Sequence, residues 1–103
     1  MTPEAKVKAK IRKILEELEC YYAMPIGTGY GNAGVPDFLV CIRGCFVGIE
    51  AKAGKGTTTA LQDKNLKLIR EAGGLALIVN EQNLDGLKKE LKDWANGHLH
   101  IGL

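Results

Sequence analysis

The chain has 103 residues, of which 46% are apolar, 25% charged and 6% aromatic. These proportions are close to globular averages and exclude intrinsic disorder, collagen-like repeats and coiled coil, so residues 1–103 should form one small domain. Fourteen Lys and Arg against twelve Asp and Glu give a net charge of +2, too small to indicate a polyanionic partner by itself. A domain of this size has little stability to spare, and a homodimer would supplement it.

No run of about eighteen apolar residues is present, and the charged start of the chain lacks the apolar segment of a secretion signal. We therefore expect a soluble, cytoplasmic protein without a membrane partner. The cysteines Cys20, Cys41 and Cys45 lack metal-ligand spacing. They are expected to be reduced thiols packed in or near strands.

The first predicted element is an amphipathic helix from Pro3 to Glu19, because apolar residues recur there at intervals of three and four. Thr2 is its expected N-cap. A short strand is expected from Cys20 to Ile26, where residues that favour strands are frequent. The segment from Gly27 to Pro36 contains four glycines and should be a loop.

Two apolar runs, Phe38 to Ile42 and Cys45 to Lys52, are separated only by Arg43 and Gly44. This spacing predicts an antiparallel hairpin. The alternation of side chains along its second strand places Glu50 and Lys52 on the same face.

A second helix is expected from Leu61 to Ala72, followed by a buried strand from Leu75 to Val79. Asn83 is the expected cap of a last helix that ends at Gly97. The order of these elements predicts an α/β sandwich with a mixed sheet.

Two acidic residues fall inside the predicted sheet, where acidic side chains are uncommon. Asp37 opens the first hairpin strand and Glu50 lies near the end of the second, so antiparallel pairing should bring them opposite each other. Two neighbouring carboxylates repel unless a cation lies between them, and a hard divalent cation such as Mg²⁺ suits such a pair. Lys52 would point at the same place and stabilise negative charge on a phosphate. This combination predicts phosphoryl chemistry.

The spacing fits a purely structural interpretation equally well. In that interpretation Glu50 and Lys52 form an ion pair on an exposed sheet face, and Asp37 is a turn residue.

A family resemblance favours the first interpretation. The run Gly-Val-Pro-Asp-Phe from Gly34 to Phe38, then Glu-Ala-Lys from Glu50 to Lys52, then Leu-Gln ending at Gln62 resembles the PD-(D/E)XK nuclease superfamily. It resembles more closely the VRR-NUC family in its compact, stand-alone versions from phages and bacteria. The resemblance reaches the first helix, which fits the family's Glu-x-x-Val-Gln-x-x-Ile opening except that Lys8 replaces the glutamine. It covers roughly residues 4 to 80.

The resemblance implies a restriction-endonuclease-like sandwich, a central mixed sheet flanked by helices. It also implies that Asp37, Glu50 and the backbone carbonyl of Ala51 bind Mg²⁺ or Mn²⁺, with no organic cofactor. Lys52 would be the catalytic lysine, and Gln62 would support the site.

Glu4 matches the family's first-helix glutamate, which lies near the metal. Glu16 or Glu17 would replace it if the helix register differs. The candidate DNA-binding residues are Lys8, Arg12, Lys55 and Lys64, which would contact backbone phosphates without reading bases. About half of such lysines are expected to be only solvated surface residues.

The resemblance implies a metal-dependent, structure-selective DNA endonuclease, most specifically a homodimeric Holliday-junction resolvase. A flap or nicking nuclease and a catalytically idle DNA-binding module of the same fold are the alternatives. An unrelated α/β protein whose charges form surface pairs is a third. The apolar tail with Leu99, Ile101 and Leu103 is a candidate dimer interface.

Overall fold

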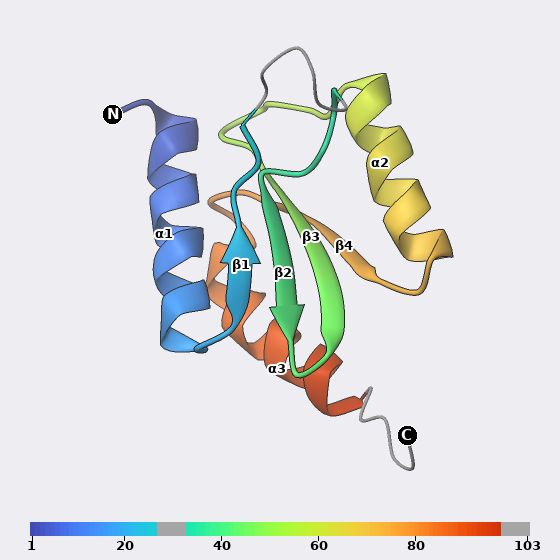
Figure 1. Cartoon of the computed structure of the whole chain (residues 1–103). Coiled ribbons are helices and arrows are strands. Elements are labelled where there is room, and N and C mark those ends of the chain that lie inside the picture. The colour runs from blue at the N-terminus through green and yellow to red at the C-terminus, as the bar shows by residue number, and fades with distance from the viewer. Residues whose placement is uncertain (27–32, 98–103) are drawn as a thin grey trace.

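In the computed structural model, which describes residues 1–26 and 33–97, four strands form one mixed sheet with helices on both faces (Figure 1). This is the predicted α/β sandwich. Residues 27–32 of the expected glycine loop, and the tail from residue 98 with its candidate interface, lie outside the described residues. The elements in chain order are α1 (Pro3–Glu17), β1 (Tyr21–Ala23), β2 (Phe38–Ile42), β3 (Cys45–Ala51), α2 (Ala60–Glu71), β4 (Leu75–Val79), η1 (Leu84–Gly86, a 3₁₀ turn) and α3 (Leu87–Gly97).

Helix α1 begins where the sequence indicates. The Thr2 hydroxyl accepts a hydrogen bond from the Ala5 N–H at 3.1 Å, which confirms Thr2 as the N-cap. The helix ends at Glu17, two residues earlier than predicted. Glu19 has a φ of 55° and so leaves the right-handed helical region, which ends the helix before it.

Strands β2 and β3 form the predicted hairpin. Arg43 and Gly44 both have positive φ angles, 50° and 81°, as a two-residue hairpin turn requires. The antiparallel register pairs Phe38 with Ile49, and β4 then pairs with β3 in parallel. The strand order in the sheet is β1-β2-β3-β4. The bounds of β2 and β4 agree with the prediction, whereas β1 is shorter than the predicted strand.

Helices α1 and α3 cover one face of the sheet and enclose the apolar core (Figure 1). Val47, Ile49 and Ala51 of β3 point to this face and are fully buried. The helices contribute the buried residues Val7, Ile11, Leu15, Leu87, Leu91 and Ala95. Burial of apolar surface on this face is the main stabilising contribution of the fold.

Helix α2 covers the other face, over β3 and β4 (Figure 1). Its close approach depends on two glycines. A Cβ atom at Gly48 would lie 2.6 Å from Ile69 Cδ1, and one at Gly74 would lie 2.8 Å from Ile69 Cγ2. The absence of these side chains therefore fixes how α2 docks on the sheet.

The predicted cap of the last helix is wrong. Asn83 makes no capping hydrogen bond; its Oδ1 accepts from the Asn80 N–H at 2.8 Å and its Nδ2 donates to the Ile78 carbonyl at 2.9 Å. The side chain closes the turn after β4, and a 3₁₀ turn carries the chain into α3.

None of the helices in the described part of the chain is long and apolar enough to cross a membrane. All three cysteines lie within that part, and no disulfide joins them there.

Candidate active site

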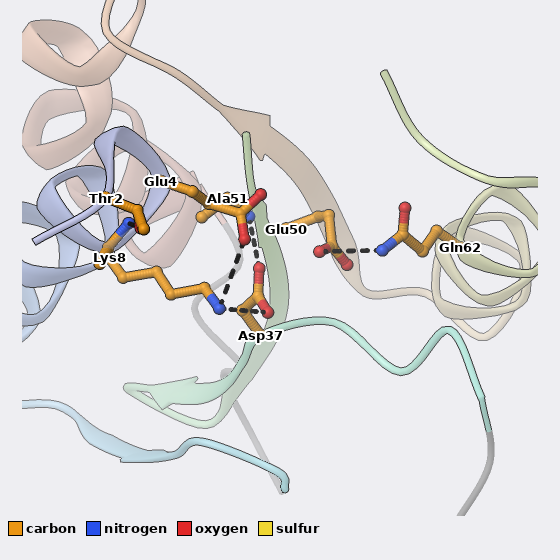
Figure 2. Close-up of polar contacts among 8 residues, drawn as sticks. Thr2, Glu4, Lys8, Asp37, Glu50, Ala51 and Gln62 are labelled. Carbon is orange, nitrogen blue, oxygen red and sulfur yellow. Dashed lines mark hydrogen bonds and ion pairs between the residues drawn. The ribbon is translucent and has the colours of Figure 1, made fainter. Parts of the chain in front are cut away.

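Asp37 lies just before β2, and the hairpin register that pairs Phe38 with Ile49 places it opposite Glu50. Its Oδ2 atom accepts a hydrogen bond from the Ala51 N–H at 2.8 Å (Figure 2). The N–H of Lys52, by contrast, donates to the Val79 carbonyl of β4 at 2.9 Å. Because the N–H and C=O of one extended residue point to the same side, the Ala51 carbonyl faces the side of Asp37.

Glu50 is the one buried charged residue of the described chain, with 3% of its surface exposed. The Gln62 amide donates to its Oε1 atom at 3.3 Å. Its Oε2 atom is buried and has no hydrogen-bond partner among residues 1–26 and 33–97. Burial, and secondarily the neighbouring Asp37, raise the pKa of Glu50 to about 8. The site therefore holds a carboxyl group that is costly to ionise as it stands.

Gln62 is oriented by the cap of α2. Its side-chain oxygen accepts from the Thr59 N–H at 2.9 Å, while its N–H donates to the Thr59 hydroxyl at 3.2 Å, forming a capping box. With the amide oxygen engaged, the NH₂ group turns to Glu50 (Figure 2). Thr59 was missed as a supporting residue, although the Thr-x-x-Gln pattern is a known signal for such a box.

Gly34 brings α2 to the site. Its φ is +85°, and a Cβ atom there would lie 2.6 Å from the Leu61 carbonyl carbon and 2.9 Å from the Gln62 nitrogen. Only glycine allows the segment before Asp37 to lie this close to the first turn of α2. The glycine of the Gly-Val-Pro-Asp run thus connects the two halves of the site.

Lys8 lies within the site rather than on an outer helix face. Its ammonium is 3.3 Å from Asp37 Oδ1 and 3.7 Å from Glu4 Oε2 (Figure 2). Burial alone would lower the pKa of Lys8, but the ion pairs with Asp37 and Glu4 outweigh it and raise that pKa. Sequence reasoning treated Lys8 as a DNA contact and missed this position, since the docking of α1 beside Asp37 is not a local property.

Glu4 is the α1 carboxylate that belongs to this group. Besides its contact with Lys8, its charge contributes to the raised pKa of Glu50. Glu16 instead accepts hydrogen bonds from Arg12 and Tyr22, and Glu17 pairs with Lys88. The two alternatives for the helix carboxylate therefore have other partners.

Lys52 follows the end of β3 and is half-buried. Its positive charge favours the ionised form of Glu50 and offsets part of the rise in that pKa. It lines an open cleft of about 540 Å³ together with Thr2, Glu4, Gly54 and Glu81, among others. A hydrogen bond stabilises the wall of this cleft: the Gly54 N–H donates to Glu81 Oε1 at 3.0 Å.

The other candidate DNA-binding residues are not gathered around the two acids. Arg12 pairs with Glu16 at 3.2 Å and with the Tyr22 hydroxyl at 3.1 Å. Lys55 and Lys64 are exposed, on the loop after β3 and on α2. Of the four candidates, the structure brings only Lys8 into direct contact with Asp37.

The structural interpretation of the motif does not hold for Glu50. An ion pair on an exposed sheet face requires an exposed glutamate, and Glu50 is buried. No salt bridge joins Glu50 and Lys52, both of which are described. Asp37 does more than close a turn, since it binds the Ala51 N–H and Lys8.

No group of three or more His, Cys, Asp or Glu side chains arranged to hold a metal ion occurs among the described residues. The donor set that the resemblance implies is smaller: the Asp37 and Glu50 carboxylates and the Ala51 carbonyl. Oxygen ligands of this kind, one or two of them carboxylates, are what Mg²⁺ takes from proteins alongside water and phosphate.

No protein-family model and no curated protein matches this chain. The resemblance to VRR-NUC nucleases stays a prediction that depends on the motif residues.

Proposed function

We propose that this protein is a divalent-metal-dependent DNA endonuclease of the PD-(D/E)XK type, similar to the VRR-NUC nucleases. The observation that carries the proposal is the buried Glu50 carboxyl group, whose Oε2 atom has no partner in the described part of the chain, beside Asp37. Burying an unpaired carboxyl group costs stability. If the site binds a cation, this loss of stability is explained, because the carboxyl group is then kept for the cation.

The residues present fit Mg²⁺ or Mn²⁺. Glu50 Oε2, Asp37 and the Ala51 carbonyl are hard oxygen donors, and no sulfur or imidazole ligand is among them. When bound, the cation would neutralise the two carboxylates and polarise a phosphodiester group.

The side chains around these donors have separate tasks. The Ala51 N–H fixes one oxygen of Asp37, and Gln62 fixes one oxygen of Glu50, so that each carboxylate keeps a second oxygen for other contacts. Lys52, which lines the cleft, would stabilise the negative charge that builds up on the phosphate as water attacks the phosphorus. The bond from phosphorus to the 3′ oxygen breaks, leaving a 5′-phosphate and a 3′-hydroxyl.

Branched DNA is the proposed substrate, and a four-way junction is the most specific form of it. We expect selection to depend on DNA shape and on phosphate contacts by residues such as Arg12, Lys55 and Lys64. A homodimer would present two sites related by a twofold axis to a junction with the same symmetry.

A flap or nicking nuclease is the alternative within this class, and an idle DNA-binding module is the alternative outside it. A module that only binds phosphate gains nothing from Asp37 and Glu50 next to it, because the Asp37 carboxylate repels the DNA backbone and the buried Glu50 carboxyl group costs stability. The buried Glu50 therefore favours an active nuclease over an idle one.

The testing experiment is cleavage of labelled four-way junction, 5′-flap, single-stranded and plain duplex DNA with Mg²⁺ or Mn²⁺. Paired symmetric cuts in the junction alone would support a dimeric resolvase, and flap or duplex cutting would support the other nuclease. The Glu50→Gln variant should be inactive on every substrate, while Glu90→Gln on the exposed surface of α3 should cut like the parent. Binding without cleavage by the parent would contradict the nuclease and favour the idle module.

A further inference from the structure

The Lys8 ammonium contacts Asp37, one of the two carboxylates that the proposed function assigns to the cation. It lies 3.3 Å from Asp37 Oδ1 and 3.7 Å from Glu4 Oε2, and it reaches this position from α1 (Figure 2). The other Asp37 oxygen already accepts the Ala51 N–H. Among residues 1–26 and 33–97 no backbone N–H donates to Asp37 Oδ1, and this is the oxygen that Lys8 neutralises.

The position of Lys8 is set by the packing of its helix. Its neighbour Val7 and the next-turn residue Ile11 are buried in the core, so the helix cannot turn away without loss of those contacts. The lysine side chain itself is 32% exposed and that of Asp37 is 21% exposed. The ammonium can thus leave Asp37 for solvent or for a ligand while α1 stays in place.

From this geometry we infer that Lys8 is a resident monovalent cation that competes with the divalent cation for Asp37. This inference depends on the proposed function, because it assumes that a divalent cation binds at Asp37 and Glu50. A divalent cation and an ammonium that contact the same carboxylate oxygen would repel each other strongly. Lys8 must therefore release Asp37 when the metal binds.

The released ammonium remains beside the site and becomes available to a phosphate of the DNA backbone. Metal binding and phosphate binding are then coupled through one side chain. By linkage, a phosphate that holds Lys8 raises the affinity for the metal, and the metal raises the affinity for the phosphate by the same factor. In the metal-free protein, Lys8 keeps Asp37 and Glu4 neutralised.

A purely structural role for Lys8 makes the opposite prediction. If the ammonium holds Asp37 and Glu4 in the correct geometry for the metal, its removal should weaken metal binding. If it competes with the metal, its removal should strengthen binding. The sign of the change in affinity separates the two roles.

The test is calorimetric titration of the full chain with Mn²⁺, without DNA. Lys8→Gln should bind Mn²⁺ roughly three- to tenfold more tightly than the parent, since about one kcal/mol of ion pairing no longer opposes the metal. Lys6→Gln is the matched control, because Lys6 is an exposed residue of the same helix with the same charge. It should change the affinity less than twofold.

Lys8→Arg keeps the charge and tests the inference independently. Its guanidinium can hold a carboxylate through two hydrogen bonds, so Mn²⁺ should bind more weakly than to the parent. If Lys8→Gln binds Mn²⁺ as tightly as Lys6→Gln does, or more weakly, the inference about Lys8 is overturned. The proposed metal site itself would not be contradicted by that result. The absence of Mn²⁺ binding in the parent and in Lys8→Gln alike would overturn the proposed function together with it. Thermal unfolding in EDTA checks that each variant is folded. If Lys8→Gln does not fold, the Mn²⁺ affinity of Lys8→Arg decides the test.

Discussion

The two faces of β3 differ in what they contribute to the molecule. On the face covered by α1 and α3, Val47 and Ile49 are completely buried in apolar surroundings. On the face covered by α2, Gly48 admits the helix and Glu50 places a carboxyl group in a buried position. One strand thus contributes stability on one side and, at its carboxyl end on the other side, a group that opposes stability.

This difference shows which part of the fold lowers the stability of the protein. Every buried side chain of the α1 and α3 face improves packing, whereas Glu50 has an oxygen atom without a partner among the described residues. Buried polar groups are usually hydrogen-bonded. Natural sequences depart from this rule mainly at functional sites. We therefore expect the apolar face to stabilise the fold and the site around Glu50 to carry the proposed function, and the following predictions test this expectation.

The largest expected effect is on catalysis. Lys52→Ala should lower the cleavage rate by about a thousandfold, because the variant would lose the positive charge that we propose stabilises the developing negative charge of the phosphate. DNA binding, measured by electrophoretic mobility shift, should stay close to that of the parent. Lys92→Ala removes a positive charge from the exposed surface of α3 and should leave cleavage unchanged. Retained cleavage in Lys52→Ala would remove this residue from the mechanism.

The second effect is on stability and belongs to the opposite face. Ile49→Ala should lower the free energy of unfolding by about 2–4 kcal/mol, since it leaves a cavity in a fully buried environment. Phe46→Ala, on the α2 face and 43% exposed, should cost clearly less although more atoms are removed. Chemical denaturation measures both. Equal losses would show that the two faces do not differ in the way described.

The third effect concerns the contact between Gly34 and α2. Gly34→Ala should lower the free energy of unfolding by about 1–3 kcal/mol and reduce cleavage, because the new Cβ displaces the backbone that carries Gln62. Gly73→Ala is the matched control: its φ of +95° imposes similar backbone strain, but no atom lies within 4 Å of the added Cβ. The variant at Gly73 should therefore lose stability but keep its cleavage rate. A parental cleavage rate in Gly34→Ala would argue against this role of the glycine.

The last effect is the dependence of stability on pH. The pKa of Glu50 is about 8 in the folded protein against an ordinary value of 4.5, so the folded state binds the proton more tightly than the unfolded state. In EDTA this group's contribution is fully present below pH 4.5, decreases as the pH rises, and is lost above about pH 8. Thermal unfolding at a series of pH values should show this decrease in the parent and a weaker one in Glu50→Gln. Parallel curves would indicate that Glu50 does not titrate as described.

Much of the fold follows from local patterns in the sequence. The bounds of β2 and β4, the hairpin at Arg43 and Gly44, and the alternation along β3 were all predictable because they depend on short-range periodicity and turn chemistry. The position of Asp37 opposite Glu50 followed from the hairpin alone.

The remaining features of the site depend on contacts between distant elements. Lys8 was expected at the DNA surface and lies against Asp37, since this contact depends on how α1 packs beside the sheet. Asn83 was expected to cap a helix and instead closes the turn after β4, because two backbone partners are near it. The burial of Glu50 likewise requires α2 above it, which no periodicity in β3 reveals.

The central claim is that Glu50 is kept in its buried position for a divalent cation, and thermal unfolding with and without Mn²⁺ tests it most directly. Binding to the folded state alone raises the melting temperature. We predict that Mn²⁺ raises it for the parent and has no effect on Glu50→Gln, which in EDTA should be at least as stable as the parent. A parent whose melting temperature does not change with Mn²⁺ would contradict the claim.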